Sequence, residues 1–228
     1  MSEETKVQNP SLLGMITNPT EQFERIKERP KIWIAMIIIT ILFVIGTWLT
    51  TLGMDIAGEM EGMEGMELDE ESIAMVQTFA AIGSAVGALF IPIFTVLISS
   101  FIYWVIAKIV KSEVSFKQLF SMNTYILIIS AIGLIINGAI MAIVGGNMDN
   151  PDAMFTSLGS LVSSGGIFGV ILNSIEVFQI WVVVLTAIGL NKVAEFSKGL
   201  AWTIAIVFFV IGIVFGMIGA AMSGFAGV

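Results

Sequence analysis

Five long apolar stretches separated by short polar connections constrain this chain more than any other feature of its sequence. They cover residues 32–53, 73–107, 120–144, 167–190 and 200–222. Each reaches the roughly 20 residues that a helix needs to cross the ~30 Å hydrocarbon core of a bilayer. With 57% hydrophobic and only 12% charged residues, a soluble domain of this length could not bury its apolar surface. We therefore predict an all-α polytopic membrane protein, with a bundle of five transmembrane helices over 32–222.

The ten basic residues fall on alternate connections only, and this pattern predicts the orientation. They lie before the first stretch, between the second and third, and between the fourth and fifth. Connections rich in Lys and Arg stay in the cytoplasm, so the N-terminus is expected inside and the short tail 223–228 outside. We predict a multi-pass protein of the cell membrane. Its basic inner face would contact anionic lipid headgroups, although the net charge is −8.

Two of the apolar regions are longer than one crossing requires. At 1.5 Å per residue, a straight helix over 73–107 would measure ~52 Å. Proline lacks the N–H that the helical ladder needs, so we expect a kink at Pro92. In the region 157–190 we expect a short helix, a break at Gly165 and Gly166, and then the fourth span.

The cytoplasmic segment 1–31 is predicted to carry an amphipathic helix over 18–29. Asn18 is a good capping residue, Pro19 suits the first helical position, and Pro30 prevents continuation. The spacing places apolar side chains on one face, so the helix is expected to lie on the inner leaflet. It would serve either as an anchor for the first span or as a docking surface for a cytoplasmic partner. Its key residues are Phe23, Ile26, Arg25, Lys27 and Arg29.

The predicted outer loop, residues 54–72, is acidic and repeats Glu-Gly-Met. Its methionines Met60, Met63 and Met66 carry soft thioethers, which suit Cu(I), beside carboxylates, which suit hard cations. The loop would either hold an extracytoplasmic copper ion or be an unstructured acidic segment whose methionines contact a partner. Because the chain has no Cys and no His, zinc lacks its usual ligands, and no cofactor is expected.

One ionisable side chain, Glu176, lies deep within a predicted span. A charge in hydrocarbon costs a few kcal/mol, so this carboxyl group should be protonated or partnered. Asn173 and Gln179 lie one turn on either side, and Asn137 in the third span is expected at a similar depth. Two interpretations remain open: a proton or cation relay, or hydrogen bonds that hold helices together.

Small residues recur at four-residue spacing along two of the predicted spans. Such ridges allow helix backbones to approach closely in membranes, either within one chain or between subunits. A homo-oligomer is therefore left open. The predicted packing residues are Gly212, Gly216, Ala220 and Gly224 in the fifth span, and Gly83 and Gly87 in the second.

Several segments, which together cover residues 11 to about 222, resemble the Yip family, named for Ypt/Rab-interacting proteins. The motifs are loose, and none of them is catalytic. They are Val114-Ser115-Phe116-Lys117-Gln118-Leu119 leading to Tyr125; Trp181 followed by Ile188-Gly189-Leu190 and Ser197-Lys198-Gly199; and Ser11-Leu12-Leu13-Gly14 through Phe23, Ile26 and Pro30.

The resemblance implies five spans with a cytoplasmic N-terminus, in agreement with the distribution of basic residues. Eukaryotic members recruit Rab partners and carry an Asp-Leu-x-Gly-Pro type segment before the first span. Residues 28–33 read Glu-Arg-Pro-Lys-Ile-Trp instead, so Rab binding is not carried over. Bacterial members of the YknW type look like accessory membrane subunits that help to assemble an ABC exporter protecting against a toxic peptide.

From the residues and the resemblance together we expect a non-enzymatic scaffold or assembly partner of another membrane complex, such as an accessory subunit of an ABC-type exporter. The alternatives are a small transporter or channel that uses Glu176, or an extracytoplasmic metal-binding membrane protein. Intramembrane hydrolysis needs paired acids, a metal or an activated nucleophile, and a single acid does not supply them. We expect the lipid bilayer and other membrane proteins as partners, and no nucleic acid.

Overall fold

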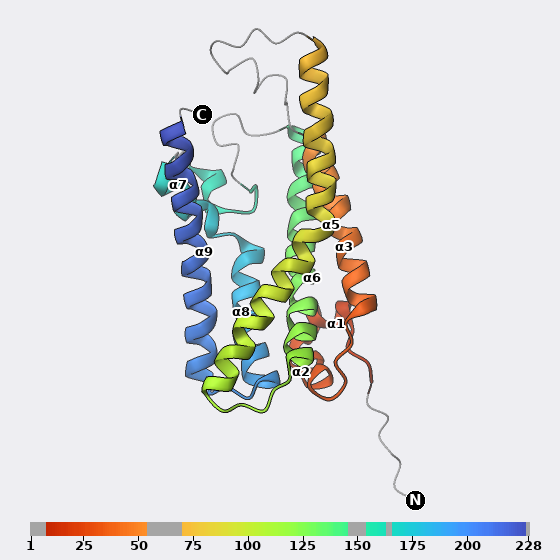
Figure 1. Cartoon of the computed structure of the whole chain (residues 1–228), viewed down its shortest axis with the longest axis vertical. Helices are drawn as coiled ribbons and strands as arrows, with labels where there is room; N and C mark the ends of the chain where they lie inside the picture. The colour runs from red at the N-terminus through yellow and green to blue at the C-terminus, as the bar shows by residue number, and fades with distance from the viewer. Residues whose placement is uncertain (1–7, 54–69, 146–153, 163–165, 227–228) are drawn as a thin grey trace, which may run out of the picture. The chain divides into compact units, whose positions relative to one another are not determined.

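The structure is a computed structural model, and it describes residues 8–53, 70–145, 154–162 and 166–226 (Figure 1). Four described helices are long and apolar enough to cross a membrane, and a fifth apolar helix, α8, is shorter. No strand occurs in these four ranges apart from an isolated bridge. The predicted all-α polytopic class is confirmed. The elements are α1 (Leu12–Thr17), α2 (Pro19–Glu28), α3 (Trp33–Leu52), α5 (Glu70–Ile109), α6 (Phe116–Val144), η1 (Leu158–Leu161), α7 (Gly166–Ser174), α8 (Val177–Val193) and α9 (Lys198–Ala226).

The fourth apolar stretch differs from its prediction, because it is two helices and not one continuous span. α7 ends at Ser174 and α8 begins at Val177, so the interruption lies at Ile175 and Glu176. Of the two glycines expected to form a break, Gly165 lies outside the described residues and Gly166 begins α7. The interruption has a tertiary cause. The Leu158 N–H donates to the Ile175 carbonyl at 3.0 Å, and the Val177 N–H donates to the Thr156 carbonyl at 3.3 Å.

Pro92 lies inside the 40-residue helix α5, as the sequence predicted, and its side chain is buried. The helical ladder therefore lacks the bond to the carbonyl of Ala88. The kink expected at this position stays a prediction. The chain divides into two compact units at this residue and within α3, α6, α8 and α9.

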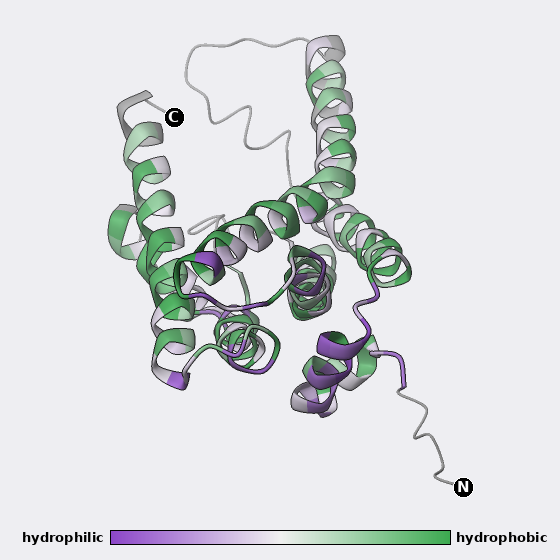
Figure 2. Cartoon of the chain, turned by 60° about the horizontal axis from the view of Figure 1, so that its bottom comes forward, coloured by the Kyte–Doolittle hydropathy of each residue, from purple (hydrophilic) through white to green (hydrophobic). Residues whose placement is uncertain are grey.

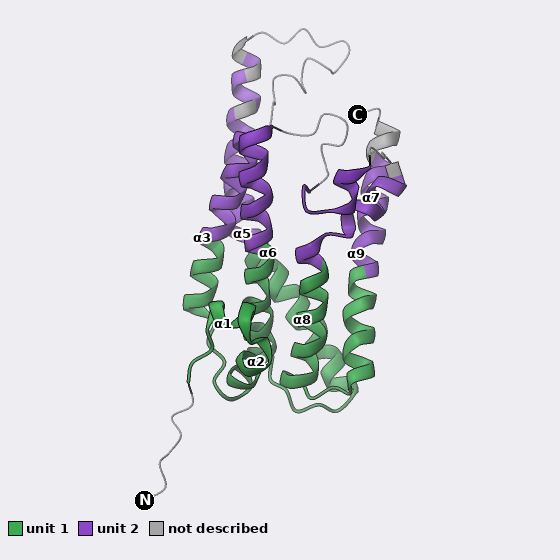
Figure 3. Ribbon diagram, turned by 180° about the vertical axis from the view of Figure 1, so that it is seen from behind, with its two compact units in different colours: residues 1–40, 92–130, 180–209 green, residues 41–91, 131–179, 210–228 purple. Residues whose placement is uncertain are grey.

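Unit 1 comprises residues 1–40, 92–130 and 180–209, and unit 2 comprises 41–91, 131–179 and 210–228 (Figure 3). All Lys and Arg residues belong to unit 1 by sequence, and unit 2 contains none. Figure 2 shows hydrophilic colour gathered on α2 and on the loops that join α5 to α6 and α8 to α9, while the long helices are mostly apolar.

The core of unit 1 lies beneath α1 and α2. Met15, Phe23 and Ile26 are fully buried, together with Leu119 and Leu190. α6 and α9 begin in the same way: the Ser115 and Ser197 hydroxyls accept N–H bonds from the first turn of each helix, at 3.3 Å. The sequence thus builds an apolar underside and two capped helix starts at the same end of unit 1.

Unit 2 is held by a close approach of α3 to α6 at glycines that the sequence analysis did not single out. A Cβ atom on Gly138 would lie 2.7 Å from the Gly46 carbonyl oxygen, and one on Gly53 would meet the Met141 carbonyl. One on Gly46 would lie 2.7 Å from Leu134 Cγ. Because glycine has no side chain, the backbones of α3 and α6 come into contact at these positions.

The glycines predicted as packing residues have more open surroundings. A Cβ on Gly216 would lie 3.1 Å from Val170 Cγ1, whereas one on Gly212 or Gly83 would meet no described atom within 4 Å. Gly87 faces only Ile91 of its own helix, at 3.3 Å. Ala220 is half-buried, and Gly224 lies outside the residues whose surroundings the structure describes. A role for these ridges between subunits stays a prediction.

Candidate functional site

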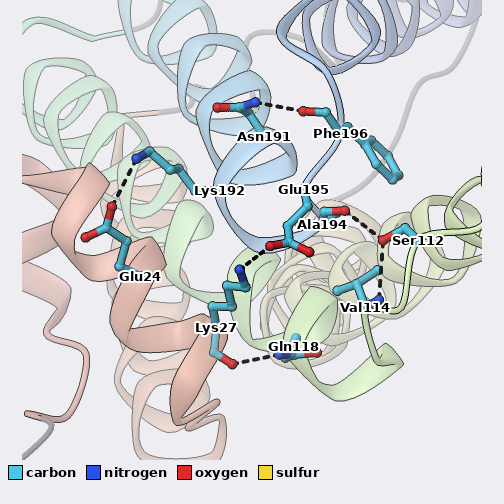
Figure 4. A network of polar contacts seen from close by, with 10 residues as sticks. All are labelled: Glu24, Lys27, Ser112, Val114, Gln118, Asn191, Lys192, Ala194, Glu195 and Phe196. Carbon is cyan, nitrogen blue, oxygen red and sulfur yellow. Dashed lines mark hydrogen bonds and ion pairs between the residues drawn. The ribbon is translucent and has the colours of Figure 1, made fainter.

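Two groups of polar residues stand out, one in each unit. The first, which we call the polar cap, consists of α1, α2, the α5–α6 loop (110–115) and the α8–α9 loop (194–197), all in unit 1 (Figure 4). Its apolar underside centres on Phe23. A Cβ on Gly189 would lie 3.1 Å from Phe23 Cε1 and 2.8 Å from Met122 Sδ, so glycine in α8 makes room for α2 and α6.

This packing corrects the expected position of the helix over 18–29. The helix exists, as Pro19–Glu28, but Phe23 and Ile26 are fully buried against the protein. They are not free to enter the inner leaflet. The capping also differs: the Asn18 amide donates to the Glu21 carboxylate at 2.8 Å and accepts no bond from the helix. Glu21 in turn pairs with Arg25.

Ion pairs connect α2 to the end of α8 and to the α8–α9 loop (Figure 4). Lys27 Nζ lies 2.5 Å from Glu195 Oε1, and Lys192 Nζ lies 3.0 Å from Glu24 Oε1. All four side chains are more than a third exposed, so each pair contributes less than about 1 kcal/mol. They therefore add little to the stability with which α2 is docked.

Hydrogen bonds to main-chain carbonyls close the cap. Gln118 Nε2 donates to the Lys27 carbonyl at 2.6 Å, and Ser121 Oγ donates to the Lys31 carbonyl at 2.8 Å, so α6 holds the end of α2 and the connection to α3. Ser112 Oγ donates to the Ala194 carbonyl at 2.7 Å, which joins the two loops. Further bonds run from Tyr125 to Pro10, from Ser11 to Gln22 and from Asn191 to Phe196.

Both loops of the cap contain a residue in the left-handed region, Lys111 at φ 62° and Glu195 at φ 56°. This conformation costs a residue with a Cβ about 1–2 kcal/mol, and glycine adopts it freely. Lys111→Gly should therefore raise the unfolding midpoint in detergent by about 2–4 °C. Lys108→Gly, in the last turn of α5, should lower it, because glycine weakens a helix. If Lys111→Gly and Lys108→Gly shift the unfolding midpoint equally and in the same direction, this account of the loop is wrong.

The second group, the break cluster, surrounds the interruption between α7 and α8 in unit 2. The Glu176 carboxylate accepts the Gln179 N–H at 2.7 Å through Oε2 and so caps α8. Its Oε1 accepts the Thr156 hydroxyl at 2.6 Å. Asn137 Nδ2 donates to Thr156 Oγ1 at 2.8 Å, and the Thr156 N–H donates to Asn137 Oδ1 at 3.1 Å. Asn137 and Glu176 are thus brought together through Thr156.

The remaining predicted polar residues occupy different positions around this cluster. Gln179 contributes its N–H, and its side chain is exposed. Asn173 Oδ1 packs against Gly159 of η1. Thr156 and Ser157 were missed, because they lie in a connection without a motif or helical periodicity. Met60, Met63 and Met66 lie outside the described residues, and among the described residues no three His, Cys, Asp or Glu side chains are grouped for a metal.

Comparison with known proteins identifies the family of the chain. The profile of the Yip1 domain matches residues 13–219. The chain is 35% identical over 224 residues to "Membrane protein YknW" of Bacillus subtilis (strain 168), which covers 98% of this chain and 95% of that relative. No solved structure matches. The chain therefore belongs to the Yip1 domain family.

Proposed function

We propose that the protein is a non-enzymatic membrane scaffold that assembles with another membrane complex, and that its partner is an ABC-type exporter giving protection against a toxic peptide. The observation that carries the proposal is the polar cap. Three segments far apart in sequence are fastened together there, and several of their charged side chains still point to solvent. An ordered, charged, solvent-exposed surface is suited to docking a cytoplasmic domain of a partner.

The exposed part of the cap offers both signs of charge. Glu28, Lys117 and Lys198 are all exposed, on α2, α6 and α9. Lys117 follows the capping residue Ser115 by two positions, so substitutions at its side chain leave that cap in place. This distribution supports recognition of a partner surface by charge pattern, in which mixed charges set register and specificity.

Site-specific photo-crosslinking in living cells tests the proposal. A photoreactive residue at Glu28 or Lys117 should give a crosslinked product with one subunit of the exporter. The same residue at Phe215, an exposed apolar position on α9, serves as the membrane-embedded control and should not give this product. If the photoreactive residue at Glu28 and Lys117 gives the same crosslinked products as at Phe215, docking through the cap is contradicted.

The second candidate function is a small transporter, and the interrupted helix at Glu176 is the observation that favours it. Discontinuous helices line substrate sites in many transporters. Purified chain in proteoliposomes would then carry solute by itself, and Glu176→Gln would stop the flux. On the scaffold proposal the chain alone gives no flux, because it acts through its partner.

A further inference from the structure

Two oxygen atoms beside the helix interruption are buried without a partner among the described residues. Ser157 is 4% exposed, and neither its Oγ nor Asn173 Oδ1 has a hydrogen-bond partner in the described ranges. A buried polar atom without a partner costs roughly 1–3 kcal/mol. Two such atoms in one small cluster are acceptors that could bind a ligand.

The backbone places Ser157 beside the carboxylate. Ser157 and Glu176 form an antiparallel bridge. The bonds that flank them, from Leu158 to Ile175 and from Val177 to Thr156, make them a non-hydrogen-bonded pair. The side chains of such a pair lie on the same face, with Cβ atoms about 4.5–5.5 Å apart. Asn173 Oδ1 meets the same segment two residues further on, at Gly159.

The charge of Glu176 has no basic side chain to balance it inside its unit, since unit 2 contains no Lys or Arg. The N-terminus of α8 supplies about half a positive charge through the Gln179 N–H. One carboxylate with several neutral oxygens and a partial counter-charge matches a single monovalent cation. A divalent ion would leave excess positive charge, and calcium sites normally use more carboxylates.

We propose that the break cluster binds one sodium ion, with Ser157 Oγ, Asn173 Oδ1 and the Glu176 carboxylate among its ligands. All three are hard oxygen donors, which suit an alkali or alkaline-earth cation and not a soft metal. The carbonyl end of α7 faces the same interruption, and helix C-termini favour cations. The ion joins α7 to η1 and α8, and so holds the interruption together.

Thermal unfolding of the full chain in detergent tests the site. At equal ionic strength, sodium chloride in tenfold excess over its dissociation constant should raise the midpoint by about 3–6 °C relative to choline chloride. Ser157→Ala should abolish this shift. Ser174→Ala is the matched control, since Ser174 Oγ donates to the Val170 carbonyl within α7, and it should keep the full shift.

Ser157→Ala also separates ion binding from a purely structural role. If no ion binds to the Ser157 hydroxyl, alanine only removes an unpaired polar atom, and the unfolding midpoint should rise in both sodium chloride and choline chloride. Glu176→Gln keeps a side-chain oxygen for the Gln179 N–H, so α8 stays capped, and the sodium shift should be lost. Binding of radioactive sodium should saturate at one ion per wild-type chain and be absent from the Ser157→Ala variant.

Three outcomes would overturn the proposal. The first is equal midpoints of the wild type in sodium and choline. The second is a Ser157→Ala variant that keeps the wild-type sodium shift and sodium binding. The third is stabilisation by acid without any effect of sodium, which would assign the site to a proton on Glu176. None of these outcomes bears on crosslinking through the polar cap, so the scaffold proposal stands or fails separately.

Discussion

Gly138→Leu should leave little correctly folded protein. The atoms that a side chain at this position would meet include the Gly46 carbonyl oxygen, at 2.7 Å from Cβ, and Thr50 Oγ1, at 2.9 Å. Overpacking usually costs about 1–3 kcal/mol when side chains can move aside, and a backbone carbonyl cannot. We expect a loss above ~3 kcal/mol, seen as a collapse of the monodisperse peak in detergent size-exclusion chromatography.

The matched control is Gly212→Leu in α9. The substitution is the same, but no described atom lies within 4 Å of a Cβ there. Its elution profile and unfolding midpoint should stay close to those of the wild type. Equal losses in the two variants would mean that leucine is harmful wherever it replaces a glycine of these helices, and that α3 and α6 do not depend on backbone contact.

Phe23→Ala should loosen the docking of α1 and α2 on the rest of unit 1. The ring is fully buried, and truncating a buried Phe costs about 3–5 kcal/mol, most of which falls on the docking of α1 and α2. Arg25 and Lys27 would then become accessible to trypsin. With the purified full chain in detergent we expect cleavage at these residues to be roughly 100-fold faster than in the wild type, since local opening controls the rate.

Leu13→Ala is the control for this experiment. Leu13 lies on α1 of the same cap, but its side chain is 76% exposed, so its removal costs little packing. Cleavage of this variant should match the wild type. If Phe23→Ala is cut no faster than Leu13→Ala, the cap is held by its ion pairs and main-chain hydrogen bonds, and the apolar underside is not what fixes it.

The sequence predicted those features that depend on local pattern. Long apolar runs gave the helical class, and Asn18, Pro19 and Pro30 located the helix over 18–29 within a residue of Pro19–Glu28. The face of that helix was assigned correctly, but its environment was not. Hydrophobic periodicity reports that Phe23 is buried. It does not report whether lipid or Gly189 and Met122 cover it.

Features that depend on contacts between distant segments were not predictable. The fourth stretch carries Asn173, Ser174 and Glu176 around Ile175 but no Gly or Pro between residues 170 and 180, so no local signal placed a break there. Its helix is interrupted where Ile175 and Val177 pair with residues 156 and 158. The small-residue ridge of α9 followed a known spacing, whereas the backbone contact of α3 with α6 uses Gly46 and Gly138, one on each helix, with no repeat in either. Asn137 and Glu176 were expected at similar depth, and the structure joins them through Thr156.

The abundance of the assembled exporter in cells that lack this chain tests the scaffold role most directly. Native gels of solubilised membranes should show a marked loss of the intact exporter, with its separate subunits still synthesised. The wild-type chain should restore the complex, and a chain with Glu28→Lys and Lys117→Glu should not. An exporter that assembles in full amount without the chain would contradict the account.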